Sequence, residues 1–288
     1  MHAQQAELIT SKLQSDIKLE DLVLPSPPKI LQAICELQNN PHQNVDNVVV
    51  LLSESQVIQE RLIQLANCVM YRGMLEIKSV KPAILRLGIS RVLSLISGMS
   101  ISQYISITRS PSLEKHFTKM WLQCLDVASI AYVIAQLKTQ IDSEKALLAG
   151  MVHNIGVLPL LLSLDNTPVF KQNPTIMRDM VDAIIPKYYP YAGRILMQSW
   201  NLPEDIISIA TNHRNLHPST HKEIELCDVI QLAFALSKTA DYTNPDYEPI
   251  EVITCPSFTK FWGNWNSAAE ELATFEEHIK LVRNIIAI

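Results

Sequence analysis

Glycine is scarce in this sequence, with seven residues among 288, where a typical protein carries about 7 %. Tight turns with positive φ and phosphate-binding loops need glycine, because a side chain would clash there. The chain contains neither G-x-G-x-x-G nor G-x-x-x-x-G-K-[ST]. A Rossmann or P-loop nucleotide site is therefore disfavoured, and so is an all-β protein. We expect an all-α fold.

Cysteine is also sparse, and its pattern excludes two classes of small stabilised domain. The five cysteines are odd in number and widely spaced, and no C-x-x-C pair occurs. A disulfide framework or a zinc ribbon is therefore disfavoured, and a reducing compartment fits best. Residues 1–17 lack the apolar core of a signal peptide, and no run approaches eighteen uninterrupted apolar residues. We expect a cytoplasmic protein that does not enter a membrane.

The chain has no excess of basic charge. Its 24 Lys and Arg residues against 29 Asp and Glu give a formal net charge of −5, which offers no general attraction to polyanions. The basic residues Lys81, Arg86 and Arg91 form no patch interleaved with aromatic residues. We therefore expect no nucleic acid among its partners.

What the sequence does contain is helical spacing of apolar residues almost throughout. Caps and periodicity predict helices that begin near residues 26, 44, 56, 79, 90, 113, 143, 186, 203 and 223. The segment Tyr188–Tyr191 is expected to be a proline-rich turn at the start of the helix over 186–200. Arg109–Ser112 is the strongest internal break, and residues 241–256 show few helical signals.

The C-terminal segment has two apolar features, each open to two interpretations. An apolar seam with steps of three and four residues runs through Leu272, Phe275, Ile279, Val282 and Ile286. It could pair with a second copy to form a homodimer, or it could lie against the body of the protein. We favour the second arrangement, because two heptads are only marginally stable as an isolated coiled coil. The aromatic group Phe258, Phe261, Trp262 and Trp265 is likewise expected in the core rather than as a docking surface.

One constellation could carry chemistry, the segment Ala149–Gly156, which contains His153 followed by Asn154. A histidine beside an acid at the end of a buried helix would suit a divalent metal that activates water. Asn154 is an amide, carries no charge and cannot bridge two metals. Taken alone, the pair favours a structural, hydrogen-bonded histidine over a metal ligand.

Several short motifs in a specific order resemble one known family. They are Leu24–Pro28, Leu65–Tyr71, Ser79–Gly88, Trp121, Ala149–Gly156, Gly193–Leu196, Trp200–Pro203 and Ile209–His213. In this order and spacing the chain resembles the HDOD domain, a bacterial signalling domain related to the HD-domain metal phosphohydrolases. The resemblance implies a compact multi-helix fold over residues 24–240. It would have an N-terminal helical part at 24–110 and an HD-like part at 111–240, between extensions at 1–23 and 241–288.

The chain departs from catalytic HD proteins at most of the positions where the resemblance expects metal ligands. Gln123 stands at the first histidine, Asn154 at the acid after His153, Tyr189 at a later histidine, and Phe234 at the final aspartate. Asn212-His213 replaces a histidine doublet. Two neutral imidazoles without a carboxylate make a poor site for a hard metal. The sequence therefore predicts no catalytic residues, no metal and no cofactor. It also predicts a vestigial pocket formed by Gln123, His153, Asn154, Tyr189, Asn212 and His213.

Two functional hypotheses follow. The first is a non-enzymatic regulatory domain that acts through protein contacts, meeting signalling proteins in trans because residues 1–23 and 241–288 are too short for a receiver domain. Its pocket either packs internally or binds a small ligand such as a nucleotide. The second is a divergent metal-dependent phosphohydrolase in which Asp126 or Asp228 supplies the missing acid. Asp126 lies one helical turn after Gln123.

Overall fold

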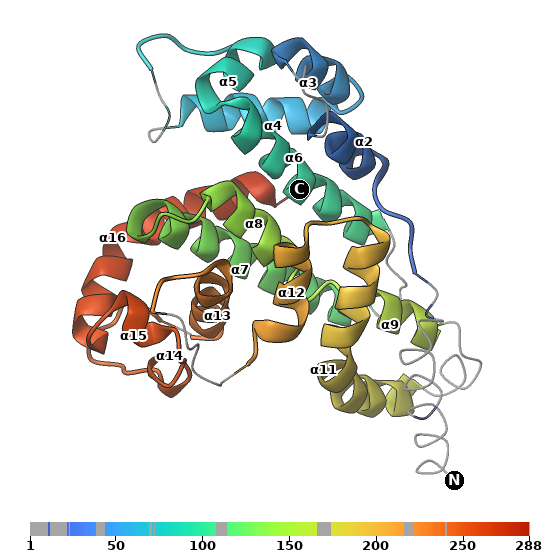
Figure 1. The fold of residues 1–288 in the computed structure, drawn as a ribbon, viewed down its shortest axis with the longest axis vertical. Coiled ribbons are helices and arrows are strands. Elements are labelled where there is room, and N and C mark those ends of the chain that lie inside the picture. Colours follow the sequence, from blue (N-terminus) through green and yellow to red (C-terminus); the bar gives the residue numbers. More distant parts are fainter. Residues whose placement is uncertain are drawn as a thin grey trace.

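The computed structural model describes residues 24–38, 44–68, 73–107, 114–165, 174–215, 222–239 and 241–287, together with Ser11, Leu22 and Tyr71. Within these residues the regular structure consists of helices and contains no strand, so the all-α prediction is confirmed. Figure 1 shows an N-terminal group of helices at one end of the molecule and the larger HD-like group below it. The predicted extension at 1–23 lies almost wholly outside the described residues, and the predicted break at Arg109–Ser112 lies entirely outside them.

The N-terminal group begins where the sequence places its caps. Asn44 forms a capping box with Asn47, each side chain accepting from the other's backbone N–H at 3.0 Å, and Ser55 caps the next helix. The group comprises α2 (Lys29–Gln38), α3 (Val45–Leu52), α4 (Gln56–Asn67), α5 (Val80–Leu87) and α6 (Ile89–Ile107).

Gly88 redirects the chain from α5 into α6. It has a φ of +86°, a conformation that disfavours any residue with a side chain. Its N–H closes α5 by donating to the Ile84 carbonyl at 2.8 Å. The axes of α5 and α6 consequently differ by 112°, which sends α6 from the N-terminal group toward the HD-like helices (Figure 1).

The HD-like part is built around α7 (Glu114–Lys138) and α8 (Ser143–Val152), followed by α9 (Val157–Asp165), α11 (Pro174–Ser199), α12 (Glu204–Asn212) and α13 (Leu226–Leu236). Helices α7 and α8 approach closely at Gly150, where a Cβ atom would lie 2.5 Å from Cα of Ala128. Two segments, Glu114–Lys138 and Ser143–Leu164, are long and apolar enough to cross a membrane by composition. Their most apolar windows are 72 % and 78 % buried inside the protein, so core packing accounts for their apolar character.

Helix α11 corrects the turn predicted at Tyr188–Tyr191, because the helix runs through Pro186 and Pro190 without a break. Pro190 has no N–H, so the carbonyl of Pro186, four residues earlier, loses its helical partner. Arg214 replaces that partner by donating from Nη1 to the Pro186 oxygen at 3.1 Å. Arg214, which lies outside the helix, thus pairs with the Pro186 carbonyl that Pro190 leaves without a hydrogen-bond donor.

The C-terminal residues cover α7. They form α14 (Ile250–Ile253), α15 (Phe258–Phe261) and α16 (Trp265–Ile286); α14 falls in the segment where few helical signals were expected. Helix α16 packs against α7, α4 and α6, and Leu272, Phe275, Ile279, Val282 and Ile286 are all buried. The seam is thus filled within one chain, and homodimerisation stays a prediction. The aromatic side chains of 258, 261, 262 and 265 are buried, which confirms their place in the core.

Candidate functional site

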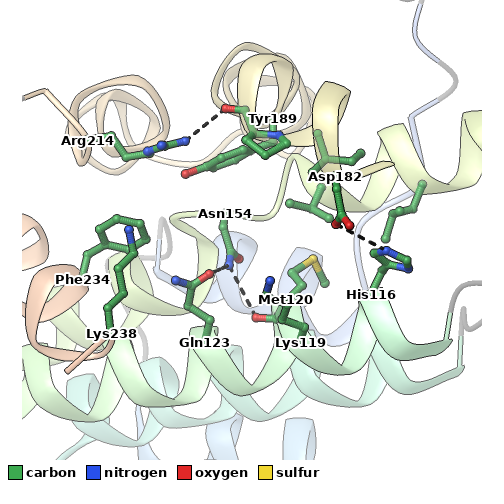
Figure 2. Close-up of a pocket in the computed structure, with 14 residues that line it drawn as sticks. His116, Lys119, Met120, Gln123, Asn154, Asp182, Tyr189, Arg214, Phe234 and Lys238 are labelled. Atoms are coloured by element: carbon green, nitrogen blue, oxygen red, sulfur yellow. Dashed lines mark hydrogen bonds and ion pairs between the residues drawn. The ribbon is translucent and has the colours of Figure 1, made fainter. Parts of the chain in front are cut away.

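A cavity of about 430 Å³ lies between α7, the start of α9, α11 and the C-terminal ends of α12 and α13 (Figure 2). Its apolar lining consists of Met120, Val157, Leu161, Ile185, Pro186 and Phe234. Its polar and charged lining consists of His116, Lys119, Gln123, Asn154, Asp182, Tyr189, Arg214 and Lys238. The volume falls within the range of about 300–1,000 Å³ that is usual for small-molecule sites.

His153 and His213 contact residues of the cavity lining, Phe234 and Tyr189, and occupy equivalent positions in the fold. Each is the residue that follows a helix, His153 after α8 and His213 after α12. Nδ1 of His153 is 2.7 Å from the Gly150 carbonyl oxygen, and Nδ1 of His213 is 2.7 Å from that of Ile209. A carbonyl can only accept, so both Nδ1 atoms carry the proton and both Nε2 atoms have a free lone pair.

The two Nε2 atoms differ in what they meet. The Tyr189 hydroxyl lies 2.8 Å from Nε2 of His213 and must donate to it. Nε2 of His153 is buried and has no hydrogen-bond partner among the described residues. The lone pair of His213 is thus closed off by a phenol, and that of His153 is desolvated and unpaired.

Phe234 packs against both imidazoles. Its ring centroid lies 5.5 Å from that of His153 and 5.1 Å from that of His213, and the two imidazole centroids are 5.1 Å apart. Burial, reinforced by the neighbouring His213, lowers the pKa of His153 to about 3. Burial likewise lowers the pKa of His213 to about 4. Both rings are neutral at pH 7, in an apolar aromatic cluster.

Asn154 is held by groups that suit an amide. Its Nδ2 donates to Oε1 of Gln123 at 3.3 Å and points to the Met120 carbonyl at 3.5 Å, and its Oδ1 accepts from the Cys124 thiol at 2.7 Å. An aspartate could not donate to the two oxygen acceptors. The amide is therefore the side chain that satisfies this buried position.

The structure brings together five of the six residues of the predicted pocket. Gln123, Asn154 and Tyr189 line the cavity, and both histidines pack against its lining residue Phe234. Asn212 is exposed and does not line the cavity; its carbonyl instead accepts from Nε2 of Gln231 at 3.0 Å. It ends α12 one residue before His213, and this places it on the other side of the turn.

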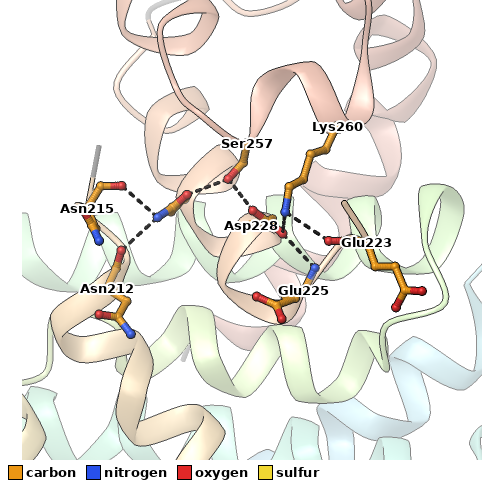
Figure 3. Close-up of polar contacts among 8 residues, drawn as sticks. Asn212, Asn215, Glu223, Glu225, Asp228, Ser257 and Lys260 are labelled. Atoms are coloured by element: carbon orange, nitrogen blue, oxygen red, sulfur yellow. Dashed lines mark hydrogen bonds and ion pairs between the residues drawn. The ribbon is translucent and has the colours of Figure 1, made fainter. Parts of the chain in front are cut away.

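The two acids considered as replacement ligands are engaged elsewhere, and neither lines the cavity. Oδ1 of Asp126 is 2.5 Å from Nε of Arg283 on α16. Asp228 is buried in the polar cluster of Figure 3, where Oδ2 accepts from Lys260 at 2.6 Å and from the Glu225 N–H at 2.8 Å. Its Oδ1 lies 2.8 Å from the Ser257 hydroxyl.

The residues present do not fit the divalent metal of the HD relatives. The site offers two neutral imidazoles, one blocked by Tyr189, and an apolar ring where a carboxylate would be needed to balance the charge of a hard cation. Among the residues that the structure describes, no group of three or more His, Cys, Asp and Glu side chains could hold a metal ion.

The charged residues around the cavity, chiefly Lys119, Arg214 and Lys238, were not predicted from the sequence. The sequence does contain a signal for Lys119 and Lys238. Lys119 precedes Gln123 by four residues and Lys238 follows Phe234 by four, so each lies one helical turn from a recognised site position. Their convergence on one cavity depends on the packing of α7 against α13, which no single-helix pattern contains.

Comparison with known proteins places this arrangement in a family. The family model for the HDOD domain matches residues 24–216. An uncharacterized protein of Treponema pallidum (strain Nichols) is 24 % identical over 260 residues, which is 84 % of this chain and 47 % of the relative. The chain thus spans about half the length of the curated relative that it matches.

Solved structures share the fold. A proposed metal-dependent phosphohydrolase from Shewanella amazonensis SB2B has a TM-score of 0.73 at 17 % identity, covering 98 % of this chain and 99 % of its own. An HDOD domain protein from Geobacter sulfurreducens scores 0.63 at 18 % identity, covering 97 % of both chains. A proposed signal transduction protein from Marinobacter aquaeolei VT8 scores 0.59 at 18 % identity, covering 96 % of this chain and 65 % of its own. At these identities the likeness concerns the fold alone. With two thirds of its length matched by the family model, the chain belongs to the HDOD domain family.

Proposed function

We propose that this chain is a non-enzymatic regulatory protein of signal transduction that acts through contacts with other proteins. One observation carries the proposal: the Phe234 ring lies 5.5 and 5.1 Å from the two imidazoles, at the position where a hydrolase would need an aspartate. An apolar ring supplies neither charge nor a lone pair to a metal ion.

The alternative, a divergent metal-dependent phosphohydrolase, finds no acid grouped with the two histidines in the part of the chain that the structure describes. Asp126 is paired with Arg283 and Asp228 with Lys260. Asp182 lines the cavity, yet its side chain is 66 % exposed and faces His116 at 3.9 Å. Recruiting Asp126 or Asp228 would require breaking an ion pair, in the case of Asp228 a buried one, which costs several kcal/mol.

The partners belong to this proposal as well. A regulatory role fits the HDOD family, and one neighbour of the same fold is a proposed signal transduction protein. In the proposal, the chain meets its signalling proteins in trans in the cytoplasm and binds neither nucleic acid nor a membrane. The formal net charge of −5 and the burial of both apolar segments support these two exclusions.

Metal content and turnover test the proposal. The protein is purified without chelator and its metals are counted by mass spectrometry. Hydrolysis of bis(p-nitrophenyl) phosphate is then followed with added Mn²⁺ or Mg²⁺. We expect far less than one metal per chain, and the same background hydrolysis in wild type, His153→Ala and His278→Ala. His278 lies on α16, away from the cavity, and serves as the matched histidine control.

Stoichiometric metal, with turnover that disappears in His153→Ala and persists in His278→Ala, would overturn the proposal. Turnover that is equal in all three proteins would identify a contaminating enzyme, and the proposal would stand. Bis(p-nitrophenyl) phosphate is an activated diester, so its hydrolysis reports phosphodiesterase activity at the site without knowledge of a natural substrate.

A further inference from the structure

Three cationic side chains border the cavity. Lys119 comes from α7, Arg214 from the end of α12 and Lys238 from the end of α13 (Figure 2). None of them forms an ion pair with an acid among the described residues. Asp182 is the carboxylate of the cavity lining, so the lining carries a formal charge of 3 − 1 = +2 with His116 neutral. The formal net charge of the whole chain is −5, so the charge of the cavity lining is opposite in sign to that of the chain.

Arg214 and Lys238 each contact neutral groups of the cavity wall. The Arg214 guanidinium donates to the Pro186 carbonyl at 3.1 Å and lies 5.9 Å from the Tyr189 ring centroid. The Lys238 ammonium lies 4.0 Å from the Phe234 ring centroid, a cation–π contact.

The environment of Lys238 also disfavours its own charge. Burial, and after it the positive charge of Arg214, lowers the pKa of Lys238. Glu251 lies with Lys238 in the lining of a second cavity, of about 250 Å³; its negative charge acts in the opposite direction on the pKa of Lys238, and the two form no ion pair. Two neighbouring cations at one cavity repel each other, and an anion between them would reverse the sign of that interaction.

The rest of the cavity is suited to an uncharged, flat group. Its lining includes the Gln123 side-chain amide and, from the opposite wall, the Tyr189 hydroxyl (Figure 2), beside the apolar side chains of Met120, Val157 and Leu161. The Gln123 amide nitrogen is a donor, and the Tyr189 oxygen, whose proton goes to His213, is an acceptor. A molecule with an anionic head and a planar hydrogen-bonding body would use both kinds of wall.

We infer that this cavity binds a phosphorylated small molecule of mononucleotide size, with its phosphate on Arg214, Lys238 and Lys119. The inference rests on the proposed function, since a hydrolase would consume such a ligand and a regulatory domain would keep it. In this inference the Arg and Lys side chains hold the phosphate through charge-assisted hydrogen bonds.

Calorimetric titration with named probes tests the inference. AMP, GMP and pyrophosphate are titrated into the full chain at low salt, with adenosine and guanosine as uncharged counterparts. We expect at least one phosphorylated probe to bind and its affinity to fall with added NaCl. We expect Lys238→Gln and Lys119→Gln each to weaken that binding about fivefold or more. Lys115→Gln removes the same charge from α7, one turn before Lys119 and outside the cavity lining, and should leave the affinity unchanged.

Each other outcome has a defined meaning. Absence of binding by all three phosphorylated probes would overturn the inference and leave the non-enzymatic proposal standing. Nucleosides that bind as tightly as nucleotides, or binding insensitive to both cavity lysine variants, would also overturn it. Chromatography of the titrated mixture distinguishes the two proposals: release of nucleoside and phosphate by wild type, but not by His153→Ala, would show turnover and sink the proposed function instead.

Discussion

Two buried polar clusters lie at opposite ends of α13, and their polar groups are stabilised in different ways. Asp228, in the first turn, forms an ion pair with Lys260 and accepts hydrogen bonds from Ser257 and a backbone N–H. Near the last turn, the imidazoles of His153 and His213 lie with Phe234 and are neutral. The chain can therefore bury a carboxylate when it supplies partners. Beside the two imidazoles the chain places the Phe234 ring, so the negative charge of a carboxylate, which a bound metal ion would need, is absent there.

The charged cluster should dominate the stability of this region. Asp228→Ala leaves Lys260 without its partner, and breaking a buried ion pair costs about 3–5 kcal/mol. We expect a loss of this size in the free energy of unfolding, measured by urea denaturation. Asp46→Ala is the matched control, because its ion pair with Lys81 has side chains that are 73 % and 55 % exposed. The control should lose less than about 1 kcal/mol; equal losses in the two variants would contradict the distinction.

A second experiment converts the neutral cluster into a charged one. In the double variant Asn154→Asp, Phe234→Asp, two carboxylates join two imidazoles whose Nδ1–H groups are already anchored on carbonyl oxygens, as in metal-binding histidines. The bound cation would displace the Tyr189 hydroxyl from Nε2 of His213. We expect about one Zn²⁺ or Mn²⁺ per chain. The metal should stabilise the fold by about 2.7 kcal/mol when its concentration is one hundred times the Kd. Metal content and the shift in Tm on adding metal provide the measurement.

The control for the double variant is Asn212→Asp, which adds an acid at an exposed position outside the cavity lining and should bind no metal. A double variant that folds and still takes up no metal would mean that side chains at 154 and 234 do not reach the imidazole lone pairs. The account of Phe234 as the replacement for a metal ligand would then be wrong.

Much of the fold was predictable from local signals. Asn44 and Ser55 cap helices at the residues where the sequence places them, and Gly88 ends α5 with a positive φ. The continuity of α11 was not predictable, because proline normally breaks a helix and the compensating bond comes from Arg214, more than twenty residues later in the chain.

The site was predictable in part. The sequence indicates His153 and His213 because each lies in a recognisable motif, and Asn154 and Tyr189 because they stand at positions where the resemblance expects ligands. Asn212 does not line the cavity, because adjacent residues of a helix point about 100° apart. The cations were missed because Lys119 and Lys238 lie on helices more than one hundred residues apart, and tertiary packing alone brings them to one cavity.

The neutral cluster should make the fold sensitive to acid. An unfolded histidine titrates near pH 6.5, whereas burial holds the folded pKa of His153 near 3 and that of His213 near 4. Below pH 6.5 the unfolded chain therefore binds protons that the folded chain cannot. Stability that is fully present above pH 6.5 is lost as the pH falls toward those folded values, by about 2 kcal/mol per ring at pH 5.

Urea denaturation of wild type and of the double variant His153→Gln, His213→Gln at pH 7.5, 6.0 and 5.0 measures this loss. We expect the variant to be less stable at pH 7.5 and to lose less stability than wild type between 7.5 and 5.0, because glutamine takes up no proton in either state. His278→Gln, on α16 and outside both clusters, is the control for a histidine-to-glutamine exchange away from the imidazole pair. If the double variant loses as much stability as wild type between pH 7.5 and 5.0, the acid sensitivity arises elsewhere, and the two buried imidazoles do not cause it.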